Sequence, residues 1–296
     1  MGARQRVTES FVGGLRFAEG PRWHDGRLWF SDQHGLAVFS AGEDGDLHRE
    51  VEVPGQPSGL GWLPDGRLLI VSMRDRRLLR LEPDGTLVAH GELSPWATFH
   101  ANDMVVSADG RSYAGNFGFD LDALMDGEPV ELRTAAMVRV DPDGSSHLAA
   151  EDLAFPNGTV LFPDGATLVV AESMGWRLTA FDVAADGSLG RRRVWAAFPA
   201  FGEEGSVSPD GCCLDAEGCI WVANAMAPEC LRVAEGGDIV DRVATGQNAY
   251  ACMLGGADRT TLYCCTAPTS HAAELTTQRS GRIEQVRVDV PGAGLP

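Results

Sequence analysis

FPNGTVLFPDGATLVVAE, residues 155–172, contains an Asn-Gly pair, an apolar run, a Pro-Asp-Gly turn and a second apolar run. A Pro-Asp-Gly turn between two β-prone runs predicts two strands joined by a tight turn. Asn-Gly is itself a common turn dipeptide, so Asn157 could serve only the backbone. The role of Asn157 can be judged from the residues that occupy the equivalent position in other copies of this unit.

The unit recurs about every 40 to 55 residues, which is the spacing of propeller blades. Its copies each pair a turn with an apolar run: GRLWFSD (26–32), GRLLIVS (66–72), GRSYAGN (110–116), GATLVVAE (165–172), GCIWVAN (218–224) and TTLYCCT (260–266). A second strand-like run follows each copy, and a more polar third run follows most of them. No segment shows sustained helical periodicity.

Four strands per unit predict an all-β fold, a six-bladed β-propeller with four antiparallel strands in each blade. The C-terminal unit lacks its outer strand, and residues 6–14, RVTESFVGG, form an orphan strand at the other end of the chain. This N-terminal strand can complete the last blade and close the ring, which removes the open sheet edges. No compositional break divides the chain, so we expect residues 1–296 to form a single domain.

The composition excludes several classes of partner. The net charge is −18, from 24 basic and 42 acidic residues, which argues against nucleic acid or an anionic membrane as a partner. No apolar run approaches the ~20 residues that span a bilayer, and the N-terminus has no apolar signal region. The seven cysteines lack the spacing of a disulfide framework or a zinc site. We therefore expect reduced thiols and a cytoplasmic location.

The residue that opens the innermost strand of each unit would face the central channel. This residue can be located in each unit by counting back from the turn glycine. The count is eight residues in most units and seven in the first. The six positions form an expected channel ring of Glu19, Ser58, Asn102, Asn157, Asp210 and, counted from Thr260 in place of glycine, Cys252. Any one of these residues alone could be structural, because Asx-Gly pairs start turns.

The ring brings together four oxygen-bearing side chains of the kind that bind hard cations, two of them anionic. Without a cation, converging carboxylates would repel one another and resist burial. The shared register therefore predicts one divalent metal ion held by Glu19, Asn102, Asn157 and Asp210. Calcium is the ion we expect, with zinc, manganese and magnesium as alternatives.

The sequence resembles the senescence marker protein, gluconolactonase and luciferin-regenerating enzyme family along nearly its whole length. The resemblance rests on FAEGPRWHDGRLWFSD, HANDMVVSADGRSYAGN, FPNGTVLFPDG, SPDGCCLDAEGCIWVAN and NAYACMLGGADRTTLYCCTA. It implies a six-bladed propeller with a single divalent metal, commonly calcium, and lactone hydrolysis as the activity. It also implies that Glu19, Asn157 and Asp210 are metal ligands and that Asn102 lies beside the metal and contacts substrate or water.

One residue departs from the family pattern. Sugar-lactone members carry an arginine two residues before the asparagine that Asn102 matches, and here that residue is His100. The period-two alternation of a strand directs His100 to the same side as Asn102. This favours a small-molecule lactone that is less polar or differently shaped than a sugar-acid lactone. The alternative is a histidine that only packs at the channel rim.

The resulting hypothesis is a metal-dependent lactonase. The metal would polarise the lactone carbonyl, and Asp210 would activate the attacking water, with His100 as the second candidate for the base. Alternation turns Asp103 away from the channel, so we expect it to be structural. No Gly-x-Ser-x-Gly elbow supports a serine hydrolase. The alternatives are phosphotriester hydrolysis at the same metal site and a non-catalytic sensor or scaffold that the metal stabilises.

Overall fold

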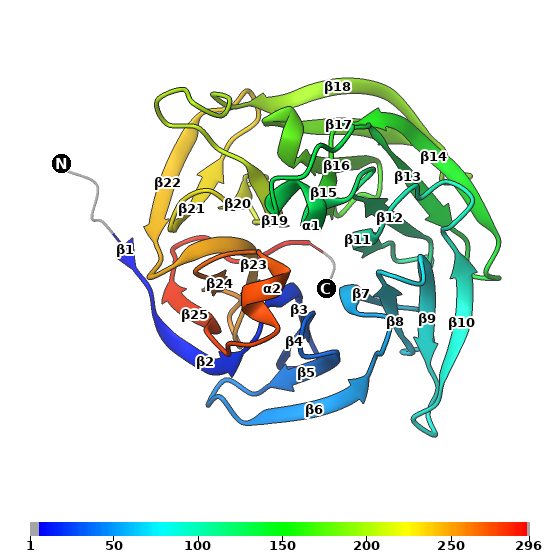
Figure 1. The fold of residues 1–296 in the computed structure, drawn as a ribbon, viewed down its shortest axis with the longest axis horizontal. Helices are drawn as coiled ribbons and strands as arrows, with labels where there is room; N and C mark the ends of the chain where they lie inside the picture. Colours follow the sequence, from blue (N-terminus) through cyan, green and yellow to red (C-terminus); the bar gives the residue numbers. More distant parts are fainter. Residues whose placement is uncertain (1–5, 295–296) are drawn as a thin grey trace.

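Six antiparallel sheets surround a common centre in the computed structural model, which describes residues 6–294 (Figure 1). The strands of the first three sheets are β3 (Ala18–His24), β4 (Arg27–Asp32), β5 (Ala37–Ala41) and β6 (Leu47–Glu52); β7 (Pro57–Trp62), β8 (Leu68–Ser72), β9 (Arg77–Leu81) and β10 (Leu87–Glu92); β11 (Ala101–Val106), β12 (Ser112–Asn116), β13 (Ala135–Val140) and β14 (Ser146–Leu153). In each sheet the strands lie in chain order from the centre outwards (Figure 1).

The other three sheets repeat this arrangement. Their strands are β15 (Pro156–Leu161), β16 (Thr167–Glu172), β17 (Arg177–Val183) and β18 (Leu189–Ala197); β19 (Pro209–Leu214), β20 (Ile220–Asn224), β21 (Glu229–Val233) and β22 (Ile239–Ala244); β23 (Asn248–Gly255), β24 (Thr261–Ala267), β25 (Gly281–Arg287) and β2 (Glu9–Leu15). The predicted six-bladed propeller with four-stranded blades is confirmed.

The N-terminal segment closes the ring, as predicted. Strand β2 is the outer strand of the sixth blade and pairs antiparallel with β25, from Glu9 opposite Gln285 to Leu15 opposite Gly281. The predicted single strand over residues 6–14 is divided, however. Its first two residues form β1 (Arg6–Val7), which pairs in parallel with β22 of the fifth blade. Arg6 also forms an ion pair with Asp241 of β22, so this segment joins two blades.

Burial follows the distance of a strand from the centre. Strand β8, with the sequence LLIVS, is buried throughout because neighbouring blades cover both of its faces. Outer strand β6, with the sequence LHREVE, is almost entirely exposed. This gradient explains why the inner runs are apolar and the outer runs polar, and it places the hydrophobic core between the blades.

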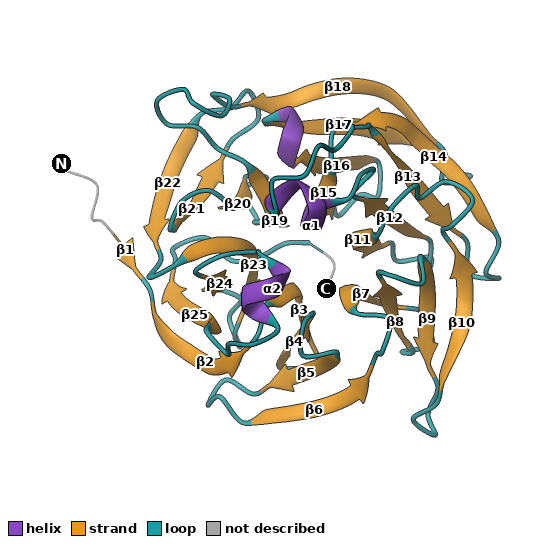
Figure 2. Ribbon diagram, in the orientation of Figure 1, coloured by secondary structure: helices purple, strands orange, loops and turns teal. Residues whose placement is uncertain are grey.

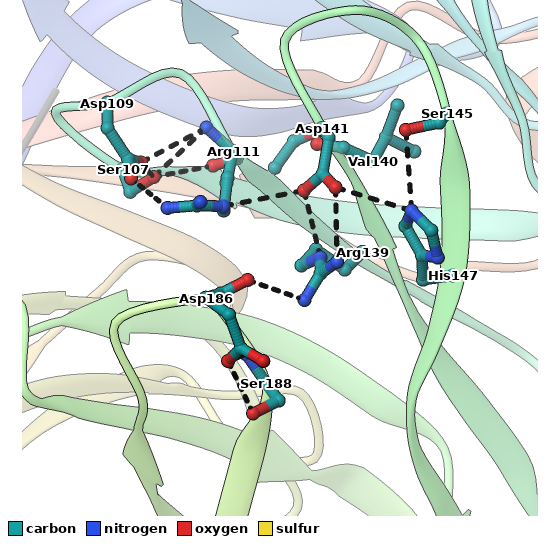
Figure 3. Close-up of polar contacts among 12 residues, drawn as sticks. Ser107, Asp109, Arg111, Arg139, Val140, Asp141, Ser145, His147, Asp186 and Ser188 are labelled. Atoms are coloured by element: carbon teal, nitrogen blue, oxygen red, sulfur yellow. Dashed lines mark hydrogen bonds and ion pairs between the residues drawn. The ribbon is translucent and has the colours of Figure 1, made fainter.

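The Asp-Gly turns are stabilised by their aspartates. Asp186 Oδ1 accepts hydrogen bonds from the backbone nitrogen of Ser188 at 2.9 Å and from its hydroxyl at 2.7 Å (Figure 3). Asp109 accepts in the same way from the backbone of Arg111, whose side chain forms an ion pair with Asp141 at 3.4 Å (Figure 3). The repeated turn dipeptide therefore has a structural role at this end of the strands.

Within residues 6–294, two short helices interrupt the all-β pattern. They are α1 (Leu121–Met125), between β12 and β13, and α2 (Ala272–Leu275), between β24 and β25; a 3-10 turn, η1 (Ser173–Gly175), follows β16 (Figure 2). Hydropathy did not predict them, because a helix of four or five residues has no measurable period. Among the described residues, no helix has the length and apolar character needed to cross a bilayer.

Candidate functional site

Each innermost strand carries an irregularity at the channel ring. In the fourth blade, the pairing of β15 with β16 shifts between Pro156 and Thr159, so that Asn157 and Gly158 lie in a bulge. The same two-residue shift occurs at the counterparts of these residues in the second, third and fifth blades. In the sixth blade the shift skips only Tyr250. In the first blade it comes one residue later, because Glu19 pairs with Ser31 and the shift lies between Glu19 and Arg22. Because a bulge redirects side chains, it is the local reason that Asn157 turns towards the channel.

The backbone at Gly158 shows whether the Asn157-Gly158 pair forms a turn. Its φ is not positive, so the pair does not form a hairpin turn. A Cβ atom at Gly158 would lie 2.5 Å from the carbonyl oxygen of Asp210, and one at Gly211 would lie 2.4 Å from Cβ of Ala251. The glycines therefore allow neighbouring blades to approach closely. Asn157 is not part of a turn, and its side chain lines the channel pocket.

The sixth member of the ring is Tyr250, and the expectation of Cys252 is wrong. The bulge of β23 lies at Tyr250, between Ala249 and Ala251. Cys252 lies two residues further along, buried in the core between blades, with its Sγ 3.7 Å from the carbonyl oxygen of Gly211. Thr260 follows Tyr250 by ten residues, whereas the turn glycine follows Asp210 by eight. Counting back eight residues from Thr260 therefore missed the ring by two positions.

The side-chain amide nitrogens of the two ring asparagines donate hydrogen bonds to other protein groups. Nδ2 of Asn157 donates to Oγ of Ser173 at 3.2 Å, and Ser173 in turn donates to the carbonyl oxygen of Pro209 at 2.7 Å. Nδ2 of Asn102 donates to the carbonyl oxygen of Pro156 at 3.4 Å. Since both asparagines line the pocket, Oδ1 of each is the atom left to bind a ligand there. No pattern in the sequence indicated a role for Ser173.

The ring carboxylates Glu19 and Asp210 are buried beside one another. Each side chain belongs to a residue that is 7% exposed. Burial raises the pKa of Glu19 well above its usual value, and the neighbouring charges of Asp210 and Asp103 raise it further. Burial, followed by the charge of Asp103, also raises the pKa of Asp210. Asp210 Oδ1 is buried and has no hydrogen-bond partner among the described residues.

Asp103 lies next to these carboxylates but is paired with Arg22. Asp103 Oδ1 lies 2.9 Å from Nη2 of Arg22, and both side chains are about 95% buried. The pairing agrees with a structural role, but the expectation that Asp103 points away from the channel is wrong, because Arg22 of the first blade meets it from across the channel. The bulge at Asn102 and Asp103 interrupts the strict alternation on which that expectation rested. If all are ionised, Glu19, Asp103 and Asp210 carry three negative charges against one positive charge on Arg22. A divalent cation would offset the remaining two charges, so the residues present fit such an ion.

The side chains available as ligands limit which metal ion the channel ring could bind. Within residues 6–294, no three His, Cys, Asp or Glu side chains are grouped so as to hold a metal ion. A cation at the channel ring would therefore need amide oxygens in addition to Glu19 and Asp210. Asn157 and Asn102 supply them, and a set made only of oxygen donors is what calcium prefers.

The ring residues other than Ser58 form the floor of a pocket of about 170 Å³. The residue two positions before the ring residue lines the wall in five blades: Phe17, Gln56, His100, Phe155 and Ser208. Other lining residues come from the connections, including Leu121 and Asp122 of α1 and Ser270 before α2. The structure therefore brings together every predicted site residue, Glu19, His100, Asn102, Asn157 and Asp210, in one pocket.

His100 lies in the wall on the same side as Asn102, as alternation predicted. It is half-buried, and its ring centroid lies 4.2 Å from that of Phe99 and 6.2 Å from that of Phe117. Burial, followed by the positive charge of Arg74, lowers the pKa of His100. The imidazole is therefore neutral near pH 7 and offers a hydrogen-bonding nitrogen to the pocket.

Fold and site together define a six-bladed propeller with a pocket that has an acidic floor at the channel ring and aromatic side chains in its wall. The chain belongs to the SMP-30/gluconolactonase/LRE-like family, whose family model matches residues 17–268. This confirms the family resemblance seen in the sequence motifs.

Three relatives show how far the similarity extends. The chain is 28% identical over 222 residues to 6-deoxy-6-sulfogluconolactonase of Pseudomonas putida, covering 71% of this chain and 72% of that protein. Luciferin-regenerating enzyme shares the fold with a TM-score of 0.80 at 20% identity, over 98% of both chains. The calcium-binding protein regucalcin of Agrobacterium tumefaciens does so with a TM-score of 0.77 at 20% identity, over 99% of this chain and 97% of that one.

Proposed function

We propose that this chain is a lactonase that opens the ring of a small-molecule lactone and depends on one divalent cation, calcium being the ion expected. The observation that carries the proposal is the buried, unpartnered Oδ1 of Asp210 beside Glu19 at the floor of a pocket. Family membership supports the reaction, since the similar Pseudomonas protein is named for a lactone. The name of the Agrobacterium protein supports calcium.

Glu19, Asn157 and Asp210 would hold the ion, with Asn102 beside it. When bound, a divalent cation supplies Lewis-acid polarisation of the lactone carbonyl. Asp210 accepts a proton from the water that attacks the carbonyl carbon, and Asn102 orients that water through Oδ1. As the bond between the carbonyl carbon and the ring oxygen breaks, Asp210 returns the proton to the ring oxygen. The product is the open hydroxy acid. His100 is the second candidate for the base.

A screen of lactones, aryl esters and phosphotriesters, each with and without chelator, tests this proposal. We expect hydrolysis of lactones that chelator abolishes and added calcium restores. Turnover of phosphotriesters alone would assign the site to the other hydrolase class. A protein that binds one equivalent of metal and hydrolyses none of these compounds would be a non-catalytic propeller.

His100→Ala is expected to lower kcat/KM for a lactone by about 10² if the imidazole acts as the base, without loss of bound metal or of melting temperature. Free imidazole added to the variant should then restore part of the rate. If His100 only shapes the pocket, KM should change and imidazole should have no effect. Wild-type kinetics on every lactone would contradict both roles and leave His100 as a packing residue.

A further inference from the structure

One side of the pocket is built from aromatic rings. Phe117, Phe155 and His100 line it together, and we call these three residues the aromatic wall. The rings of Phe117 and Phe155 are stacked, with centroids 4.7 Å apart and planes inclined by 20°. Phe119 packs behind Phe155 at 5.7 Å. The wall therefore presents a fixed apolar surface above the acidic floor.

The backbone at Phe155 is strained in a way that positions its ring. Phe155 has a φ of +61°, a left-handed conformation that is unfavourable for a bulky residue. It also precedes Pro156, which further restricts its backbone. Strain of this kind persists only where the surrounding structure imposes it, and it concentrates at ligand sites. Here it directs an aromatic side chain into the pocket wall rather than into the core.

Apart from the proposed metal ion, no cationic side chain of the described residues lines the pocket directly. No lysine or arginine belongs to the described lining, which does include Glu19, Asp122 and Asp210. Arg74 is exposed and outside the lining, but its Nε donates to Oε1 of the lining residue Gln56 at 3.0 Å and its charge acts on His100. With the ion bound, the charges of Glu19 and Asp210 are offset, so a carboxylate, sulfonate or phosphate against the wall would meet Asp122 and no cationic side chain in the described lining.

We infer that the preferred substrate is an uncharged lactone carrying an alkyl or aryl substituent, with that substituent against the aromatic wall. The inference rests on the proposed lactonase function and specifies its substrate class. The lactone carbonyl lies at the ring of Glu19, Asn102, Asn157 and Asp210, and the substituent extends from the floor towards Phe117 and Phe155. Burial of the substituent supplies the binding energy that an arginine supplies to a sugar acid.

The test compares four δ-lactones: δ-valerolactone, which has no substituent, δ-decalactone, which has a pentyl chain, glucono-δ-lactone and a δ-lactone bearing a carboxylate. We expect kcat/KM for δ-decalactone to exceed that for the other three by about tenfold or more. Phe117→Ala should lower kcat/KM for δ-decalactone by about 10- to 100-fold and that for δ-valerolactone by less than about threefold. His100→Arg should raise kcat/KM for the carboxylate-bearing lactone relative to kcat/KM for δ-decalactone.

Phe162→Ala is the matched control. Phe162 is half-buried like Phe117 but lies in the turn between β15 and β16, outside the pocket. Its replacement should lower the melting temperature comparably and leave the substrate preference unchanged. A preference for glucono-δ-lactone, or a Phe117→Ala variant with the wild-type order of substrates, would overturn the inference and leave the lactonase function standing.

Binding of non-hydrolysable δ-lactams separates the two failures. Calorimetry on the wild-type protein should show that 6-pentyl-2-piperidinone binds about tenfold more tightly than unsubstituted δ-valerolactam, and that Phe117→Ala removes the difference. If no lactone is hydrolysed but this difference holds, the proposed reaction is wrong and the aromatic wall is still a binding site for an apolar group. Equal binding of the two lactams would refute the role of the wall.

Discussion

Replacing Asp210 with alanine is expected to reduce bound divalent cation from about one equivalent to none, and to lower lactone hydrolysis by at least about 10² to 10³. The reason is that Asp210 supplies both charge and an oxygen that no other described group satisfies. Metal analysis of the purified protein and kcat/KM measure the two effects. Ser58→Ala is the control, because Ser58 occupies the channel ring but is not a proposed ligand. It should retain the metal.

Asp210→Asn gives the same prediction a second readout that does not depend on catalysis. With chelator present, this variant should melt at the same temperature as the wild type or higher, because it removes one of the buried negative charges near Glu19. With calcium present the order should reverse, because only the wild type gains the binding energy of the ion. A wild-type protein without metal, or a variant that keeps it, would contradict the proposed site.

The sequence predicted the channel ring because its register repeats. Asn102, Asn157 and Asp210 each lie eight residues before a turn glycine, and Glu19 lies seven residues before one. Strand geometry then determines where these side chains point. The error at Cys252 came from the same procedure, since the distance from the ring residue to the reference position is longer in the sixth blade. Tyr250 could have been found by aligning Ala249–Tyr250 with Pro209–Asp210 instead of counting from the turn.

The pocket wall was only partly predictable. The alternation argument that placed His100 applies equally to Phe155, two residues before Asn157, so the apolar wall had a signal in the sequence. Leu121 and Ser270 had none, because they lie in connections whose lengths differ between blades. The pairing of Asp103 with Arg22 also depends on how blades one and three meet across the channel, which no local pattern encodes.

Deleting residues 6–15 is expected to lower the melting temperature by roughly 10 to 20 °C and to reduce solubility. Val12 and Leu15 of β2 are 5% and 3% exposed. Loss of each buried side chain lowers the free energy of unfolding by about 1.5 to 3 kcal/mol. Each kcal/mol lost lowers the melting temperature of a domain of this size by about 2 to 4 °C. The deletion also leaves β25 as an uncovered edge, which favours aggregation. Thermal unfolding and light scattering measure both effects.

Two point variants distinguish loss of this strand from a general effect of truncation. Val12→Asp places a charge at a buried position of β2 and should reproduce much of the loss, whereas Ser10→Ala alters an exposed position of the same strand and should leave melting unchanged. Unchanged melting of the truncated protein would show that the sixth blade does not need β2. Because the N-terminal segment also pairs with β22 through β1, its loss should loosen the contact between the fifth and sixth blades. Among the proposed ligands, Asp210 lies in the fifth blade and Glu19 in the first, on either side of the sixth blade, so the truncated protein should also bind calcium more weakly.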